Sequence, residues 1–147
     1  MHNIVVLGGN FAGVSAAHYI LRHVLPLLNN EKSAYKVTLI SPSDHTFFKV
    51  GVPRALVSSP DLERPFASIP DALQNYKPSE FSFIQGEAVG VDETTKTVSV
   101  KSTGNSKDSS TQYDSLVIAT GTTSVCISRS PPFLFQWLLK CNRLHLE

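Results

Sequence analysis

The hydrophobic pattern opens with a short apolar run, residues 4–7, that shows no alternation with polar positions. Such a run is typical of a strand buried on both faces of a parallel sheet. Glycines follow at once, and apolar residues then recur every three or four positions, which predicts a helix over residues 13–25. Pro26 is expected to kink or restart that helix. Residues 35–40 predict a second strand, so the whole unit predicts parallel βαβ topology with a right-handed crossover.

The pattern weakens after this unit and becomes informative again in the second half of the chain. Residues 52–57 predict a short helix that Pro53 interrupts. Residues 81–86 predict a strand, and residues 87–92 continue it after a break. Residues 97–101 alternate between apolar and polar positions, which predicts a hairpin with the preceding strand.

The C-terminal part of the chain contains three stretches of different character. Residues 103–111 are rich in serine and predict a mobile loop, whereas residues 113–121 predict a last strand with an apolar centre and a glycine stop. Residues 125–147 hold closely spaced apolar residues that no single helix or strand face can bury, so we predict a poorly packed appendage there. The predicted fold is an α/β domain over residues 1–124, whose parallel sheet carries a helix layer on one face and a β-hairpin layer on the other.

Composition and charge narrow the class of protein. The 147 residues suffice for one domain or two small ones, and a hydrophobic content of 41% is enough for a core. Lysine and arginine (13) nearly balance aspartate and glutamate (12), which argues against a dedicated nucleic-acid binder. No apolar run approaches the roughly 20 residues that span a bilayer, and the first residues lack the features of a secretory signal. We expect a cytoplasmic globular protein, whose oligomeric state the sequence does not set.

The cysteines and helical histidines predict neither a disulfide framework nor a metal site. Cys126 and Cys141 are only two, and no zinc-ligand spacing surrounds them. His18 and His23 stand five positions apart, which separates them by roughly 140° around a helix, so they do not share a face.

The main candidate for chemistry is the glycine-rich turn Gly8-Gly9-Asn10-Phe11-Ala12-Gly13, which follows the first strand and opens the first helix. This is the context that a dinucleotide-binding fingerprint requires, although a tight turn in another α/β protein is the alternative. Gly8 permits the turn, Gly13 lets helix and strand approach, and the helix N-terminus offers N–H groups to a pyrophosphate. Asn10 replaces the middle glycine of G-x-G-x-x-G. Because its Cβ would crowd the phosphate, the sequence predicts that Asn10→Gly keeps or strengthens binding.

Two further positions fit a dinucleotide site. Such folds usually place an acidic residue at the end of the second strand to bind ribose hydroxyls. Ser41 stands there, with Asp44 three residues later. The serine hydroxyl can still bind a ribose, or it can simply end the strand. The run Ala119-Thr120-Gly121 ends the last predicted strand with small side chains that allow the backbone to pass close beneath a ligand.

The order of the glycine turn, the hairpin at residues 87–92 and the Ala119-Thr120-Gly121 strand end resembles the FAD-binding half of the two-domain flavoproteins of the pyridine-nucleotide-disulfide oxidoreductase superfamily. The resemblance covers residues 1–123 and is strongest to the apoptosis-inducing-factor-like branch, which includes ferroptosis suppressor proteins. It implies a Rossmann-like FAD/NAD(P)-binding domain whose glycine turn holds the FAD pyrophosphate. It further implies that Arg54 contacts FAD and that the backbone of Ala88 meets the adenine.

The resemblance also sets expectations about activity. The full-length relative would pass a hydride from NAD(P)H to FAD and then electrons to a quinone-like acceptor. The second glycine fingerprint, the Gly-Asp motif for the ribityl chain and the Cys-x4-Cys pair of thiol-dependent members are absent from these 147 residues. We therefore expect a truncated FAD-binding fragment that is inactive alone, without catalytic residues or a metal, whose partner is a small-molecule cofactor. The alternatives are a small non-catalytic nucleotide-binding protein, half of a split oxidoreductase, or a plain NAD(P)-dependent dehydrogenase. The hairpin together with Ala119-Thr120-Gly121 favours an FAD-binding protein over the dehydrogenase.

Overall fold

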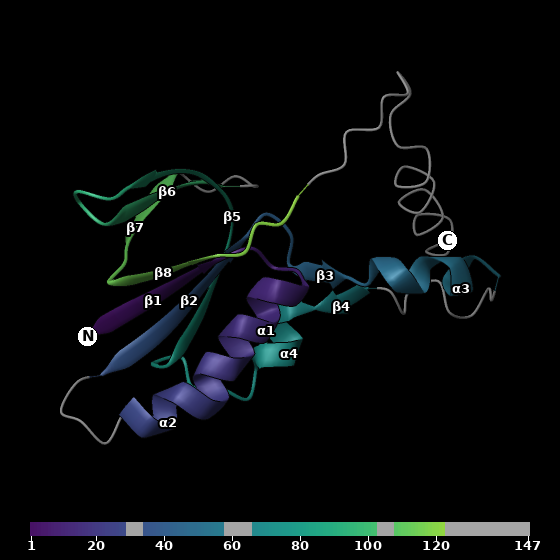
Figure 1. Cartoon of the computed structure of the whole chain (residues 1–147), viewed down its shortest axis with the longest axis horizontal. Coiled ribbons are helices and arrows are strands. Elements are labelled where there is room, and N and C mark those ends of the chain that lie inside the picture. Colours follow the sequence, from purple (N-terminus) through teal and green to yellow (C-terminus); the bar gives the residue numbers. More distant parts are fainter. Residues whose placement is uncertain (29–33, 58–65, 103–107, 123–147) are drawn as a thin grey trace, which may run out of the picture.

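The computed structural model describes residues 1–28, 34–57, 66–102 and 108–122. Within them, six strands form one mixed sheet in the order β7-β6-β5-β2-β1-β8 (Figure 1). The four strands β5, β2, β1 and β8 run parallel, and β6 and β7 continue the sheet in antiparallel fashion. The bounds are β1 His2–Leu7, β2 Tyr35–Ser41, β5 Phe81–Asp92, β6 Thr97–Ser102, β7 Ser109–Gln112 and β8 Ser115–Ile118. The appendage predicted for residues 125–147 lies outside the described residues.

Helices cover one face of the parallel strands, and the β5–β6–β7 segment curls over the other (Figure 1). The helical layer consists of α1 (Phe11–Tyr19), α2 (Leu25–Leu28) and α4 (Ile69–Leu73). This arrangement confirms the predicted α/β fold with a helix layer and a hairpin layer. It also confirms that the three apolar runs starting at residues 4, 37 and 116 share one sheet.

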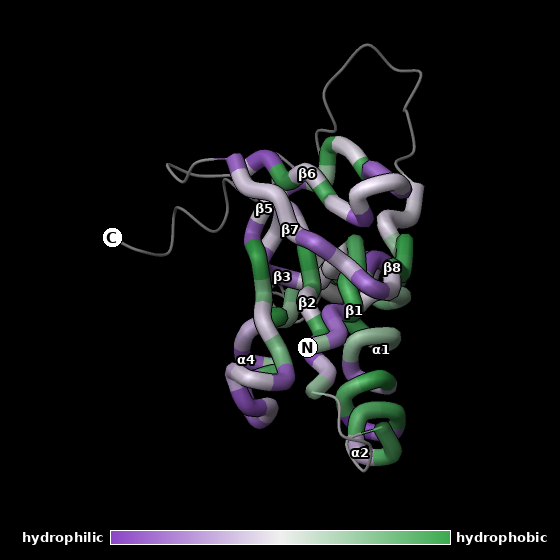
Figure 2. The backbone as a smooth tube through the Cα atoms, turned by 90° about the vertical axis from the view of Figure 1, so that its left-hand side faces the viewer, coloured by the Kyte–Doolittle hydropathy of each residue, from purple (hydrophilic) through white to green (hydrophobic). Residues whose placement is uncertain are grey.

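Each face of the sheet has its own core, because β1 and β2 are apolar on both sides. Figure 2 shows the strongest hydrophobic character in β1, β2 and the α1–α2 segment, whereas β7 is hydrophilic. The side chains buried between sheet and helices are Ile4, Val6, Ala17, Leu21, Leu25, Val37, Leu39, Ile69 and Leu73. Those buried between sheet and hairpin are Val5, Leu7, Ile40, Val98 and Val100.

The first helix departs from the prediction at both ends. It begins at Phe11 rather than at residue 13, because Asn10 caps it. After Tyr19 the chain forms a π-helical stretch, η1 (Ile20–Val24), and returns to α-helix in α2. Pro26 has no N–H, and its ring would crowd the carbonyl one turn back, so a wider turn before it relieves both problems without breaking the helix.

Several shorter elements correct the sequence prediction. The strand expected to break after residue 86 is continuous in β5, with a bulge between Ala88 and Gly90. The serine-rich loop contains β7, which pairs with β6 through its backbone. Pro53 does not interrupt the short helix α3 (Val52–Val57), because it lies in the first turn, where a backbone N–H has no partner to lose.

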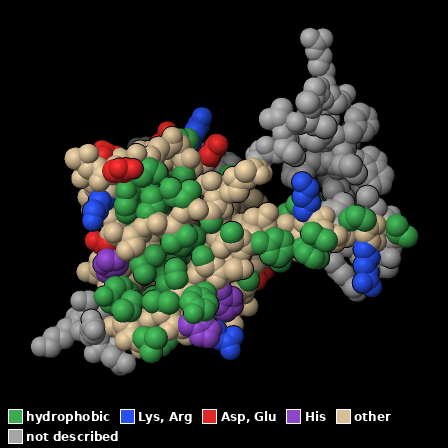
Figure 3. Space-filling view, in the orientation of Figure 1, with side chains coloured by type: hydrophobic (Ala, Val, Ile, Leu, Met, Phe, Trp, Pro, Cys, Tyr) green, Lys and Arg blue, Asp and Glu red, His purple; other side chains and the backbone are tan. Residues whose placement is uncertain are grey.

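The chain between β2 and β5 forms a separate two-stranded sheet, which the sequence did not predict. It consists of β3 (His45–Phe47) and β4 (Phe66–Ser68), which pair in antiparallel fashion. A 3₁₀ turn, η2 (Lys49–Gly51), leads from β3 into α3, which stands apart from the main sheet (Figure 1). Apolar side chains gather over the face that carries α1 and again toward α3 (Figure 3).

Candidate functional site

The turn between β1 and α1 is built from three glycines, each of which approaches a different neighbour. Gly8 has a φ of +113°, and a Cβ there would meet the carbonyl oxygen of Ala119. A Cβ at Gly9 would meet the hydroxyl of Ser41, and one at Gly13 would meet the carbonyl oxygen of Gly8. The turn therefore cannot carry side chains at these three positions without displacing its surroundings.

The end of β8 lies directly beside this turn. The N–H of Ala119 donates to the carbonyl of Leu7 at 2.8 Å, and the N–H of Gly8 donates to the carbonyl of Ile40 at 2.8 Å. Gly121 has a φ of +69°, and a Cβ there would meet no atom of the described residues within 4 Å. The structure thus brings Gly8 through Gly13, Ser41 and the Ala119–Gly121 segment together at the carboxyl edge of the parallel strands, where open α/β sheets bind ligands.

Asn10 caps the first helix and presents its N-terminus to this edge. Its side-chain Oδ1 accepts a hydrogen bond from the N–H of Phe11 at 3.0 Å and another from the Thr46 hydroxyl at 3.0 Å. The first bond along the helix runs from the Val14 N–H to the Asn10 carbonyl at 2.9 Å. The N–H groups of Ala12 and Gly13 precede the helical ladder and are available to a ligand, whereas that of Phe11 already donates to Asn10.

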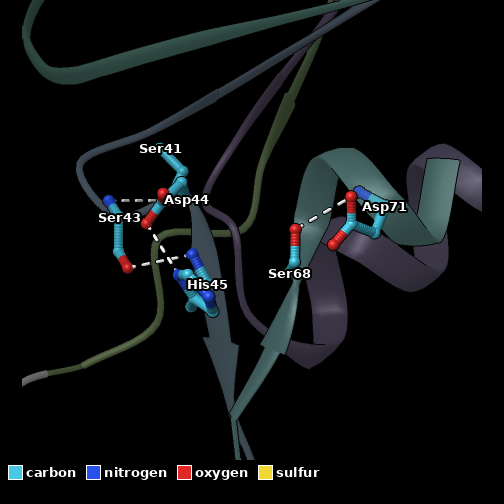
Figure 4. A network of polar contacts seen from close by, with 6 residues as sticks. All are labelled: Ser41, Ser43, Asp44, His45, Ser68 and Asp71. Carbon is cyan, nitrogen blue, oxygen red and sulfur yellow. Dashed lines mark hydrogen bonds and ion pairs between the residues drawn. The ribbon is translucent and has the colours of Figure 1, made fainter. Parts of the chain in front are cut away.

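The end of β2 forms a small polar network of its own (Figure 4). Ser41 is only 3% exposed, and its Oγ accepts a hydrogen bond from the Ser43 N–H at 3.3 Å. The ring Nδ1 of His45 lies 2.8 Å from Oδ1 of Asp44, and this hydrogen bond holds the pKa of the Asp44 carboxyl below its ordinary value. Asp44, rather than Ser41, is the partly exposed side chain at this strand end.

Two of the predicted site residues lie away from the glycine turn. Arg54 is exposed in α3, the helix that stands apart from the main sheet (Figure 1). Ala88 is half-buried in β5 next to the bulge, pairs with Val100 and packs against the core on the hairpin side. Their contacts with a cofactor remain predictions from the resemblance.

Sequence reasoning missed Thr46 and Phe48. Thr46 bonds to Asn10, and the ring of Phe48 packs edge-on against that of Phe11 with 5.4 Å between centroids. Both contacts attach the β3 segment to the start of α1. The only local signal in the sequence is that a polar residue, Thr46, precedes two aromatic ones. This pattern does not identify Asn10, 36 residues earlier, as the partner of Thr46.

A separate polar cleft of about 620 Å³ lies at the opposite, amino edge of the parallel strands. Asn3, Thr38 and Ser82 line it, and their side chains bond to one another across three strands, at 2.9 Å and 3.1 Å. Because it lies at the other end of the sheet, this cleft is not part of the glycine-turn site.

The described residues hold neither a candidate metal site nor a candidate membrane-spanning helix. Among residues 1–28, 34–57, 66–102 and 108–122, no group of three or more His, Cys, Asp or Glu side chains is placed to hold a metal ion. In the same part of the chain, no helix has the length and apolar character to cross a membrane.

Comparison with known proteins agrees with this geometry. The family model described as pyridine nucleotide-disulphide oxidoreductase matches residues 2–132. Oxidoreductase phnG of Penicillium herquei is 41% identical over 123 residues, covering 81% of this chain and 28% of the relative. Ferroptosis suppressor protein 1 of Xenopus tropicalis is 30% identical over 118 residues, covering 80% of this chain and 26% of the relative.

Solved structures share the fold. The sulfide:quinone oxidoreductase of Aquifex aeolicus superposes with a TM-score of 0.69 at 24% identity, covering 98% of this chain and 32% of that chain. The present chain therefore spans less than a third of the length of these relatives. The family match covers most of the sequence and includes the whole glycine-turn site. The chain belongs to the pyridine nucleotide-disulphide oxidoreductase family.

Proposed function

We propose that this chain is the FAD-binding part of an NAD(P)H-dependent flavoprotein oxidoreductase. The longer protein would take a hydride from NAD(P)H and deliver electrons to a quinone-like acceptor. The observation that carries the proposal is the convergence of the glycine turn and the end of β8 at the carboxyl edge of the sheet, in a chain of this family.

The residues at this edge fit a dinucleotide. The glycines at positions 8, 9 and 13 permit the tight turn that brings the start of α1 to this edge. The positive dipole end of the helix there favours the negative charge of a pyrophosphate. Asn10, Phe11 and Ala12 would contribute the remaining donors. The other residues of the proposed site are Ser41, Arg54, Ala88, Ala119, Thr120 and Gly121.

Bound FAD would supply the redox chemistry, since the isoalloxazine ring accepts a hydride and releases electrons to an acceptor. The role of this chain's own residues is to bind and orient. The glycine turn fixes the pyrophosphate, and the polar end of β2 offers Asp44 and His45 to the ribose side of the site. No cysteine lies in residues 44–60, so disulfide reduction through a Cys-x4-Cys pair there is not part of the proposal.

The test is an equilibrium titration of the full 147-residue chain with FAD, followed by flavin fluorescence and visible absorbance. The informative variant is Ala12→Glu, because a carboxylate in the first helical turn favours the helix but repels a phosphate. Gln74→Glu is the matched control, since it adds the same charge at an exposed position at the end of α4.

We expect wild type and Gln74→Glu to bind FAD equally, and Ala12→Glu to bind at least tenfold more weakly. Binding of NAD⁺ or ATP without any binding of FAD would contradict the proposal and favour a nucleotide-binding protein of another kind. Equal FAD affinity of all three proteins would place the flavin elsewhere on the chain.

A further inference from the structure

We propose that the carboxamide of Asn10 is a cofactor-binding group, in which Nδ2 donates a hydrogen bond to a pyrophosphate oxygen while Thr46 holds the side chain in place. This inference deepens the proposed function and rests on it. It assigns a binding role to the residue that replaces the middle glycine of the fingerprint, and a positioning role to a residue 36 positions away.

The orientation of the carboxamide follows from its two neighbours. The backbone N–H of Phe11 can only donate, so the atom 3.0 Å from it must be Oδ1 of Asn10. The Thr46 hydroxyl donates to the same oxygen, also at 3.0 Å. Both lone pairs of Oδ1 are then engaged. A flipped carboxamide could still donate to the Thr46 hydroxyl, but it would lose the bond from the Phe11 N–H, which fixes the orientation.

The consequence is a fixed amide donor at the mouth of the site. Asn10 is exposed, and no acceptor for Nδ2 is found among residues 1–28, 34–57, 66–102 and 108–122. Its two N–H bonds therefore stand beside the free N–H groups of the first turn of α1. A pyrophosphate offers only acceptor oxygens, so this set of donors is complementary to it.

The backbone of Asn10 excludes the simplest alternative reason for its presence. Its φ of −107° and ψ of −167° are extended values that any residue adopts, so asparagine is not required there for a left-handed conformation. Helix capping alone does not require it either, because Asp and Ser cap equally well. The chemical feature that asparagine has and those residues lack is the amide donor.

The proposal predicts weaker cofactor binding by Asn10→Gly, the opposite of the expectation from sequence that this change keeps or strengthens binding. The side chain is fixed by its bonds to Phe11 and Thr46 rather than projecting freely from the turn. Removing it would take away one donor and release the bond between β3 and the start of α1.

One variant is Asn10→Asp in the 147-residue chain. Because its added charge alone would repel a phosphate, the matched neutral variant is Asn10→Ser, which can cap the helix without the amide donor and should also lose FAD affinity. Aspartate keeps the oxygen that caps the helix, but it replaces the amide donor with a second oxygen carrying negative charge. We expect an unfolding midpoint at or above that of wild type, together with at least a tenfold loss of FAD affinity. FAD affinity within twofold of wild type would overturn the inference.

Thr46 is tested with a conservative pair. Thr46→Val removes the hydroxyl at nearly constant volume, and Thr46→Ser restores it. We expect a several-fold loss of FAD affinity in Thr46→Val and recovery in Thr46→Ser; equal affinity of the three proteins would refute the positioning role.

A spectroscopic readout separates ligand contact from capping. The side-chain ¹H–¹⁵N resonances of Asn10 should shift on addition of FAD or of inorganic pyrophosphate, whereas a purely capping side chain would leave them in place. If wild type binds no FAD, the proposed function fails and this inference fails with it. If wild type and Asn10→Asp both bind FAD tightly, only the inference about Asn10 fails.

Discussion

Gly13→Ala should destabilise the fold even though alanine is the better helix former. Two effects of opposite sign compete at this position, which lies in the first turn of α1. Replacing glycine by alanine in a helix stabilises it by about 1 kcal/mol. However, the new Cβ would meet the carbonyl oxygen of Gly8 and would lie 2.9 Å from the carbonyl carbon of that residue.

The steric cost of the new Cβ exceeds the gain in helix propensity and decides the sign of the change in stability. Overpacking typically costs about 1–3 kcal/mol, and occasionally more. We expect the upper part of that range, because the obstructing atoms belong to the backbone of the β1–α1 turn and cannot rotate away. Subtracting the gain in helix propensity leaves a net loss of about 2 kcal/mol. For a chain of this length, that corresponds to a fall in Tm of about 4–8 °C.

Gly90→Ala is the matched control for this prediction. Gly90 lies in β5, and among the described residues a Cβ there would meet only the Cβ of Ser99, at an ordinary contact distance of 3.9 Å. Urea or thermal unfolding followed by circular dichroism measures both variants. We expect Gly90→Ala to match or exceed wild type. A Gly13→Ala protein as stable as wild type would show that the turn can relax, and it would refute the argument from crowding.

Three further predictions concern the core, the hairpin turn and activity. Leu39→Ala should lower the unfolding free energy by about 2–5 kcal/mol, because Leu39 is fully buried between sheet and helices; a smaller loss in urea unfolding would contradict that packing. Hydrogen bonds from Thr95 and then Thr94 lower the pKa of Asp92. The stabilisation of the turn by the ionised carboxyl should therefore be fully present above the ordinary pKa of aspartate and should disappear as the pH falls through the lowered pKa. An NMR titration in which Asp92 shows an ordinary pKa would refute this. The 147-residue chain with added FAD and a quinone should oxidise NAD(P)H no faster than free FAD, and faster turnover would show a second nucleotide site.

The elements that the sequence predicted are those in which the element's own hydrophobic pattern reflects which of its side chains are buried. Residues 4–7 are apolar without alternation because β1 is covered by helices on one face and by the hairpin on the other. Residues 97–101 alternate because β6 buries Val98 and Val100 and exposes the side chains between them. In both cases the local period is a direct consequence of the tertiary environment.

The elements that the sequence missed owe their form to distant contacts. The strands β3 and β4 have three residues each and are paired with one another, with Phe47 stacked on Phe66. The helix α4 has five residues, begins with a Ser68 cap, and its first N–H donates to the carbonyl of Asp44 at 2.8 Å. Such short segments contain too few positions to show a period.

The candidate site also combines features that the sequence predicted with features that depend on distant contacts. The glycine turn was predictable because its spacing is local, and the end of β8 was predictable because small residues follow an apolar run. The burial of Ser41 was not, because it results from the close approach of Gly9 to the end of β2. The bond between Thr46 and Asn10 was not predictable either, because it depends on the path of β3.

The three glycines therefore bear on the fold more directly than on the ligand. Gly8 is crowded by Ala119, Gly9 by Ser41, and Gly13 by Gly8 itself, so each is required by the chain's own atoms. Substituting them tests folding, and a loss of FAD binding in such variants would not separate the two effects. The side chains that face outward from the same turn can be changed without filling these contacts. Asn10→Asp, which keeps the capping oxygen, and Ala12→Glu are consequently the substitutions with which cofactor binding can be measured independently of stability.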